Sequence, residues 1–214
     1  GCISLNTFKR IHKEFINHTR KLLGGVILHK DYEKIKSLDW EKIKVPKIIN
    51  IGTLFLIVLS IFIGQYYVSL SELIESIIQM PLLALLIPLL IFVYIIFHEL
   101  IHGILMKYFS GITPQYGISG PFIFAKSEAI FNKNAYILIT LAPMLILGIT
   151  SLVLSFVIPG TGVWLAILLW IINLYASRGD LQAIILLKDY PRTYGIKDDG
   201  DSLQIYKPLK RTLS

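Results

Sequence analysis

Four long apolar segments dominate this chain of 214 residues. They cover residues 48–68, 81–109, 135–158 and 162–187. A helix needs roughly 20 apolar residues to cross the hydrocarbon core of a bilayer, so each segment is long enough to span it. Because a spanning backbone must satisfy its hydrogen bonds internally, we expect four transmembrane helices and predict an all-α integral membrane protein.

The composition agrees with this fold class and excludes others. Hydrophobic residues make up 54% of the chain and charged residues only 16%, whereas a soluble domain carries roughly 25% charged residues. A disordered chain would need the opposite composition. The formal net charge is +7, but no recognition motif for nucleic acid is present, so we predict no nucleic-acid partner.

The positions of the basic residues indicate the topology. Eleven of the 21 Lys and Arg residues precede the first apolar segment, three follow near the end of the second, and seven lie near the end of the fourth or beyond it. The loop 69–80 and the turn 158–162 contain none. By the positive-inside rule, both termini and the loop between the second and third segments are cytoplasmic. We therefore expect a multi-pass protein of a cell membrane.

Polar regions flank the predicted membrane domain, residues 48–187. In residues 1–47, Phe8, Ile11 and Phe15 recur at near-helical spacing among basic residues, which predicts an N-terminal amphipathic helical region. Such a region can lie on the anionic inner leaflet, or it can be a solvated helix that packs on the protein itself. Residues 188–214 are predicted to form a cytoplasmic tail.

The loop at residues 111–134 has a pattern of its own. Its aromatic and β-branched residues are interrupted by Gly117 and by Gly120-Pro121. Glycine and proline at these points favour short strands joined by turns. We predict a short interfacial loop that resembles a β-hairpin, and a plain re-entrant loop is the alternative.

The second apolar segment contains His98-Glu99-Leu100-Ile101-His102, an H-E-x-x-H pattern. Residues four apart share a helix face, so both imidazoles can bind one Zn²⁺ ion, and Glu99 lies beside them as a general base toward water. The alternative is two buried histidines bonded to neighbours, with Glu99 paired to a cation. Because a charged side chain inside a membrane helix costs about 2.5–3.5 kcal/mol, the pattern favours a functional site.

A zinc site of this kind needs a third protein ligand. Among the 14 acidic residues, only Glu99 and Asp180 lie inside apolar segments, which makes Asp180 the candidate. His98 and Asp180 lie at similar depths, about 25 Å and 27 Å along their segments at 1.5 Å per residue. The alternative is a pair between Asp180 and Arg178, but residues two apart do not face each other on a helix.

Two neighbours of Asp180 are candidates for substrate or oxyanion support. Asn173 can donate to a substrate or a ligand, or it can form an interhelical hydrogen bond. Arg178 can stabilise an oxyanion, or its side chain can extend to the lipid headgroups.

These features together resemble the intramembrane zinc metalloproteases of the site-2 protease type. They are more closely similar to a small family of bacterial membrane proteins described as zincin peptidases, in which the H-E-x-x-H pattern is followed by a late Gly-Asp, here Gly179-Asp180. The resemblance covers residues 81–187 and implies a catalytic core of three helices with a zinc cofactor. In site-2 proteases proper the aspartate precedes its glycine, and here the order is reversed.

The sequence therefore predicts an intramembrane zinc metalloprotease. It would hydrolyse peptide bonds of membrane-embedded or membrane-adjacent substrates near the cytoplasmic face, with a membrane protein or peptide as its partner. One alternative is a zinc-binding pseudoprotease or regulatory membrane protein without peptidase activity. Another is an ion transporter that uses the same side chains as a relay, although no internal repeat is present.

Overall fold

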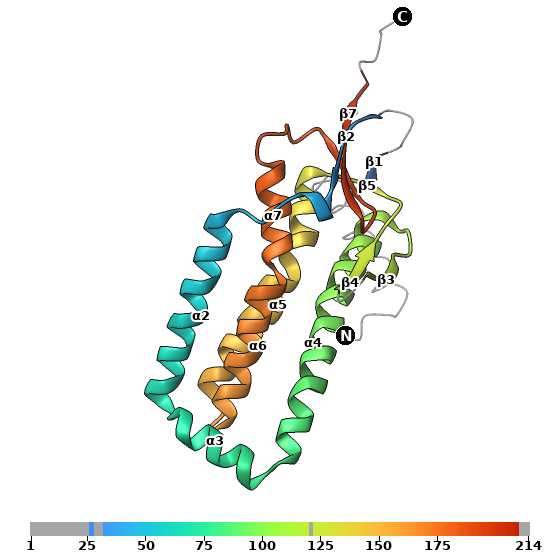
Figure 1. Cartoon of the computed structure of the whole chain (residues 1–214). Coiled ribbons are helices and arrows are strands. Elements are labelled where there is room, and N and C mark those ends of the chain that lie inside the picture. Colours follow the sequence, from blue (N-terminus) through green and yellow to red (C-terminus); the bar gives the residue numbers. More distant parts are fainter. Residues whose placement is uncertain (1–25, 28–31, 120–121, 210–214) are drawn as a thin grey trace, which may run out of the picture.

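The computed structural model describes residues 26–27, 32–119 and 122–209 of the chain. A bundle of long helices forms one end of the molecule and small antiparallel sheets form the other (Figure 1). The helices are α2 (Lys47–Tyr67), α3 (Leu70–Gln79), α4 (Leu82–Ser110), α5 (Lys133–Val157), α6 (Gly162–Ala176) and α7 (Arg178–Leu187), with a short 3-10 helix, η2 (Trp40–Lys42). The strands are β1 (Val26–Ile27), β2 (Tyr32–Asp39), β3 (Gln115–Ser119), β4 (Phe122–Lys126), β5 (Ile130–Asn132), β6 (Gly195–Asp198) and β7 (Ser202–Pro208).

Within the described residues, four helical stretches are long and apolar enough to cross a membrane. They are residues 47–67, 84–110, 133–157 and 162–187. The last of these consists of α6 and α7, which meet at Ser177. The backbone N–H of Ser177 donates to the Asn173 carbonyl at 3.0 Å, and the Ser177 carbonyl accepts from Leu181 at 3.0 Å, so the two helices follow one another almost without interruption.

The spanning helices contact one another through small residues and hydrogen bonds. A Cβ atom on Gly148 of α5 would lie 2.6 Å from Nδ2 of Asn173, so the glycine lets α6 approach closely. Asn173 donates from Nδ2 to the Met144 carbonyl at 2.9 Å. Trp170 of α6 donates from Nε1 to the Ser60 hydroxyl of α2 at 3.0 Å. Close approach and interhelical hydrogen bonds are the usual means of packing where lipid is as apolar as the side chains.

The prediction of an all-α protein is wrong. The end of the molecule that the sequence predicts to face the cytoplasm contains a five-stranded antiparallel sheet. Its strand order is β1-β5-β6-β7-β2, so strands from both ends of the described chain lie side by side. Residues 32–39, which the sequence placed in an amphipathic helical region, are strand β2. Phe8, Ile11 and Phe15, on which that helix was predicted, lie outside the described part of the chain. Strands β6 and β7 occupy part of the predicted tail, residues 188–214.

The hairpin predicted between the second and third spanning segments is present as β3 and β4, which pair from Gln115–Lys126 to Ser119–Phe122. It packs against α4 close to the H-E-x-x-H pattern. Gly103 allows this contact, because a Cβ atom there would lie only 2.1 Å from the Tyr116 hydroxyl.

The main hydrophobic core lies where the helix ends meet the sheets, and not along the middle of the bundle. It joins α4, α5 and α7 to β4, β5, β6 and β7. Its members include Met106, Phe109, Phe131, Ile139, Leu187, Ile196, Leu203 and Ile205, all at most 4% exposed. The ends of α4, α5 and α7 are therefore fixed by packing of the kind found in soluble proteins.

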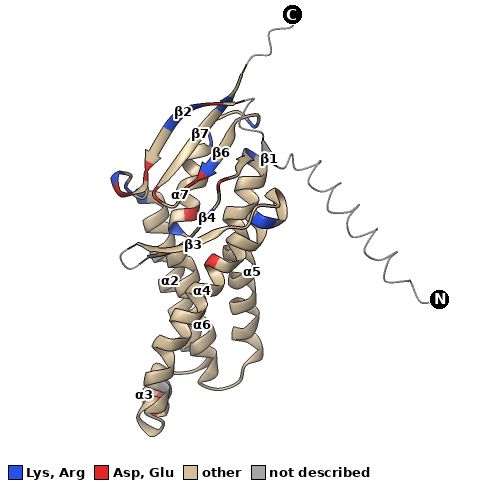
Figure 2. Ribbon diagram, turned by 90° about the vertical axis from the view of Figure 1, so that its right-hand side faces the viewer, with Lys and Arg blue, Asp and Glu red and all other residues tan. Residues whose placement is uncertain are grey.

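The charged residues divide in the same way (Figure 2). Lys and Arg gather at the sheet end, over β2, β6 and β7 and at the neighbouring helix ends. The opposite end of the bundle is formed by α3, which carries Glu72 and Glu75 and no basic residue. The sheet end is therefore the end to which the positive-inside rule assigns the cytoplasmic side, and this orientation stays a prediction.

Candidate metal centre

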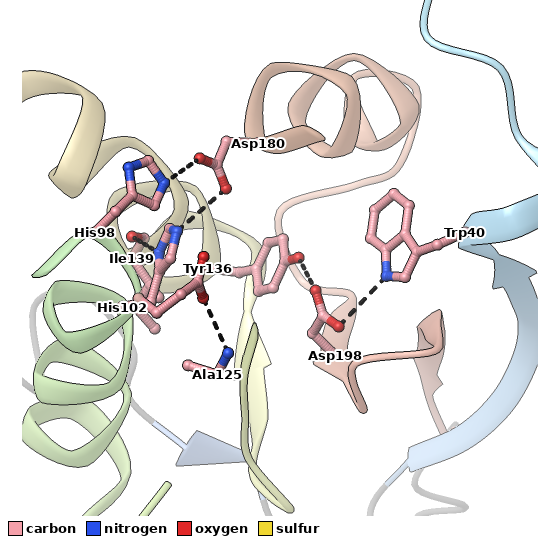
Figure 3. Close-up of polar contacts among 9 residues, drawn as sticks. Trp40, His98, His102, Ala125, Tyr136, Ile139, Asp180 and Asp198 are labelled. Atoms are coloured by element: carbon pink, nitrogen blue, oxygen red, sulfur yellow. Dashed lines mark hydrogen bonds and ion pairs between the residues drawn. The ribbon is translucent and has the colours of Figure 1, made fainter. Parts of the chain in front are cut away.

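Helix α4 places the two histidines of the H-E-x-x-H pattern one turn apart on its inner face. His98 and His102 are 3% and 8% exposed, and their ring centroids lie 5.1 Å apart. Buried imidazoles need polar partners, and both are directed toward the same side chain on another helix (Figure 3).

That side chain is Asp180 in the first turn of α7. Its Oδ2 lies 3.2 Å from Nε2 of His98, and its Oδ1 lies 3.3 Å from Nε2 of His102. The structure therefore brings together the three residues that the sequence proposed as ligands. One ligand atom from each lies within 4.8 Å of the others, a spacing that could hold a metal ion.

The chemistry of this donor set fits zinc. Two imidazole nitrogens and one carboxylate oxygen are ligands that Zn²⁺ commonly takes, and catalytic zinc sites use three protein ligands and keep a fourth position open. The three residues are contributed by α4 and α7, whose ends are fixed in the hydrophobic core. A rigid support of this kind suits a metal site.

The two imidazoles differ in what their second nitrogen contacts. Nδ1 of His102 lies 2.9 Å from the carbonyl oxygen of Ile139 in α5. Nδ1 of His98 is buried and has no hydrogen-bond partner among the described residues. The orientation of the His102 ring is therefore set from both sides, while that of His98 is set only through Nε2.

Glu99 is hydrogen-bonded to the hairpin and lies beside the candidate ligands. Its Oε2 accepts a hydrogen bond of 3.0 Å from the backbone N–H of Ala125 in β4. The carboxylate lines the same cavity as His98, His102 and Asp180. A carboxylate held in this place by a backbone donor can act as an acid or base beside a metal.

A second polar cluster lies beside the first and connects α5 to the sheet. The Tyr136 hydroxyl donates to Oδ2 of Asp198 at 2.8 Å, and the Gly200 N–H and Trp40 Nε1 donate to Oδ1 at 3.0 Å and 3.5 Å. Burial raises the pKa of Asp198 above its ordinary value, and the hydrogen bonds from Gly200 and Tyr136 oppose this shift. The cluster fixes the β6–β7 turn against α5 (Figure 3).

Both clusters line one cavity of about 940 Å³ that extends between the helices. Away from the polar groups its wall is aliphatic and comes from α2, α4 and α6. The aliphatic residues include Ile57, Ile91, Ile95, Ile171 and Ile172. A mostly apolar cavity with a few convergent polar groups is the usual form of a ligand site.

The two supporting residues predicted from the sequence lie in different places. Asn173 is fully buried between α5 and α6 and donates to Met144, away from the residues that line the cavity. Arg178 lines the cavity. Its guanidinium lies 4.7 Å from the centroid of the Tyr175 ring and donates to Oδ1 of Asn50 in α2.

Sequence reasoning missed the groups that hold the predicted residues in place. The Ala125 N–H and the Ile139 carbonyl belong to the backbone, so their residue types carry no direct signal. Tyr136 and Asp198 come from segments 62 residues apart, and neither stands in a recognisable motif. Their association depends on how the sheet packs against α5.

The comparisons with known proteins give one match, to a family model. No curated protein and no solved structure matches the chain. A family model described as "Putative zincin peptidase" matches residues 90–194, just under half of the chain. The matched region runs from α4 through α7 and contains all three candidate ligands. The match thus indicates a zinc metallopeptidase with Zn²⁺ as its cofactor, for which His98, His102 and Asp180 form a suitable group.

Proposed function

We propose that this chain is an intramembrane zinc metalloprotease. It hydrolyses peptide bonds of membrane-embedded or membrane-adjacent substrates near the cytoplasmic face. One observation carries the proposal: the two histidines of an H-E-x-x-H pattern on one apolar helix meet Asp180 of another apolar helix inside a single cavity. The lipid bilayer and a membrane protein or peptide substrate are the partners that this location implies.

His98, His102 and Asp180 would hold the zinc ion. When bound, zinc supplies Lewis-acid activation of water and of the scissile carbonyl. Glu99 accepts a proton from the attacking water and returns it to the leaving amine, as a general base and then as a general acid. The Ala125 N–H keeps the Glu99 carboxylate in its position beside the cavity.

Strand β4 offers a place for the substrate backbone. Because the Ala125 N–H donates to Glu99, it points away from the partner strand β3, and this edge of β4 faces the cavity. A helical substrate must unwind before hydrolysis, since its amides are otherwise bonded within the helix. An extended segment can then pair with β4 by strand addition.

The walls of the cavity favour apolar substrate side chains. Ile91 and Ile95 of α4 and Ile171 and Ile172 of α6 present branched aliphatic groups on the way to the metal ligands. A side chain that enters from water gains about 25 cal/mol per Å² of apolar surface buried here. One that enters from lipid gains no such term, because lipid is as apolar as this wall, but it has no polar group to leave unbonded. Polar segments gain nothing comparable from this wall, so we expect cleavage next to aliphatic residues.

The test combines metal content with cleavage. The purified full chain is reconstituted with synthetic single-span peptides of aliphatic sequence, and products are identified by mass spectrometry. We expect about one zinc per chain and cleavage in the wild type. Glu99→Gln should keep its zinc while the cleavage rate falls by about 10²–10⁴-fold. Glu75→Gln on α3, at the opposite end of the bundle, is the matched control and should cleave at the wild-type rate.

Two results would contradict the proposal. One is a wild-type protein that binds no zinc, and the other is Glu99→Gln cleaving as fast as the wild type. A wild type that holds zinc but cleaves none of the peptides would favour the alternative of a zinc-binding regulatory protein.

A further inference from the structure

The carbonyl that contacts His102 lies in the middle of a helix, where a carbonyl normally has a partner already. In an α-helix the carbonyl of residue i accepts from the N–H of residue i+4. For Ile139 in α5 that donor would belong to residue 143. Instead, Nδ1 of His102 in α4 lies 2.9 Å from this oxygen.

Residue 143 is a proline, and proline has no N–H. Pro143 is fully buried inside α5, and Ile139 is 1% exposed. The Ile139 carbonyl therefore has no donor from its own helix at position i+4 and no access to water. A buried carbonyl without a donor is costly, so the imidazole N–H of His102 satisfies a group that Pro143 has released.

This contact decides which nitrogen of His102 carries the hydrogen. A carbonyl oxygen can only accept, so Nδ1 must be the donor. In the neutral ring the lone pair then belongs to Nε2, which is the atom that lies 3.3 Å from Asp180 Oδ1 in the candidate metal centre. Metal-binding histidines commonly have their second nitrogen fixed in this manner.

We propose that Pro143 is a positioning residue for the metal centre. By removing one hydrogen bond of α5, it leaves the Ile139 carbonyl free to fix the tautomer and the ring orientation of His102, so that Nε2 is presented to the metal. The inference rests on the proposed function, because it assumes that His102 is a zinc ligand. It assigns to a helix-interior proline a task other than bending the helix.

The chain contains its own control. Pro88 is the other proline inside a described spanning helix. It is exposed, and it precedes His98 by ten residues in α4. Replacing either proline with alanine restores one backbone N–H and removes the same ring, but only position 143 lies opposite a carbonyl that contacts a candidate ligand.

The experiment measures zinc affinity, by competition with a chelator, for the full-length wild type, Pro143→Ala, Pro88→Ala and His102→Ala. In Pro143→Ala the restored N–H competes for the Ile139 carbonyl. Since loss of such an outer contact typically weakens metal binding by about 10–100-fold, we expect a decrease in this range for Pro143→Ala. Pro88→Ala should stay within about twofold of the wild type, and His102→Ala should bind weakest.

Metal-free thermal unfolding of each variant checks that it is folded, and Pro143→Ser, which also restores the N–H, replaces the alanine variant if that does not fold. Wild-type affinity in a folded Pro143→Ala, together with loss of zinc in His102→Ala, would overturn this inference alone. A wild type that binds no zinc would overturn the proposed function and the inference with it. Equal weakening in Pro143→Ala and Pro88→Ala would show a general effect of helix bending and would also overturn it.

Discussion

At the sheet end of the molecule Phe131 and Ile196 are at most 1% exposed, whereas at the other end of the bundle Leu85 and Phe156 are 70% and 66% exposed. The first region, β4 to β7 with the adjoining ends of α4, α5 and α7, is packed like a soluble domain. The second region, the helices farther from the sheets, presents its large apolar side chains outward, as helices surrounded by lipid do. The candidate metal centre lies between the two.

The difference in packing between the two regions gives a reason why the candidate metal centre lies at their junction. The spanning helices provide an apolar cavity and the candidate metal ligands, and they contact one another through close approach at Gly148 and hydrogen bonds such as that from Trp170 to Ser60. The sheet region supplies fixed groups, such as the Ala125 N–H that holds Glu99 and the Asp198 carboxylate that holds Tyr136. A site at the junction can have both an apolar cavity and a rigid support.

The largest expected effect tests whether stability is concentrated in the sheet region. Phe131→Ala removes a fully buried side chain from the core and should lower the free energy of unfolding by about 3–5 kcal/mol. Phe156→Ala is the matched control on the lipid-facing side of α5 and should change it by less than about 1 kcal/mol, since lipid is as apolar as the protein interior. The measurement is chemical unfolding in detergent micelles. Similar losses for both variants would show that the two regions are not packed differently.

A smaller effect is expected from the close contact between α5 and α6. Gly148→Ala places a Cβ atom 2.6 Å from Nδ2 of buried Asn173, which must shift away from its bond to Met144. Overpacking of this kind should cost about 1–3 kcal/mol of unfolding free energy. Gly52→Ala in α2, where nothing lies within 4 Å, is the control and should be neutral or stabilising, because alanine favours helix over glycine. If Gly148→Ala were equally harmless, close approach would not hold the spanning region together.

The smallest effect concerns the hydrogen bond from Tyr136 of α5 to Asp198 of β6, and it depends on pH. The pKa of Asp198 is raised by burial, and the Tyr136 hydroxyl partly offsets the shift by bonding the ionised form. A carboxyl group whose pKa is higher in the folded state than in the unfolded state, where it is about 4, stabilises the fold while it is protonated in both states. This contribution is lost as the pH rises through the pKa of the folded state. Tyr136→Phe should raise the Asp198 pKa further and enlarge that loss, by about 1 kcal/mol at pH 7.

The measurement is the free energy of unfolding of Tyr136→Phe between pH 4 and pH 8. Tyr66→Phe, on a side chain that is 86% exposed, is the control and should follow the wild type throughout. A difference between Tyr136→Phe and wild type that stays constant over this range would mean that the hydroxyl does not act through the ionised form of Asp198.

The spanning helices could be predicted from the sequence because their signal is local. An uninterrupted apolar run such as residues 48–68 leaves a membrane helix as the natural outcome. The candidate ligands His98 and His102 stand in a motif, and Asp180 is conspicuous as an acid in an apolar segment. These features need no knowledge of which parts of the chain meet.

The sheet could not be predicted in the same way. Strand β2 has mostly exposed side chains, among them Lys34 and Lys36, so it lacks the alternation of a half-buried strand. Its pairing with β7 joins Ser37 to Gln204, far apart in sequence, and local periodicity carries no sign of it. The supporting groups of the site were missed for the same reason, since the Ala125 N–H reaches Glu99 only once the hairpin is seated on α4. Pro143 does show which carbonyl of α5 lacks its i+4 donor, but that His102 lies opposite this carbonyl depends on how α4 packs against α5.

The pairing of β2 with β7 also has a consequence for when the site can form. Residues 32–39 are among the first of the described chain to be synthesised, and residues 202–208 are among the last. Contacts between distant residues form late, after a long loop has been closed. During translation the four apolar helices can enter the membrane one after another. At that stage Trp40 of η2 cannot yet bond to Asp198, because the β6–β7 turn has not been synthesised. A growing chain that has passed Asp180 but not β7 would thus hold every candidate ligand without its completed support, and the candidate site would be complete only as synthesis nears the end of this sheet.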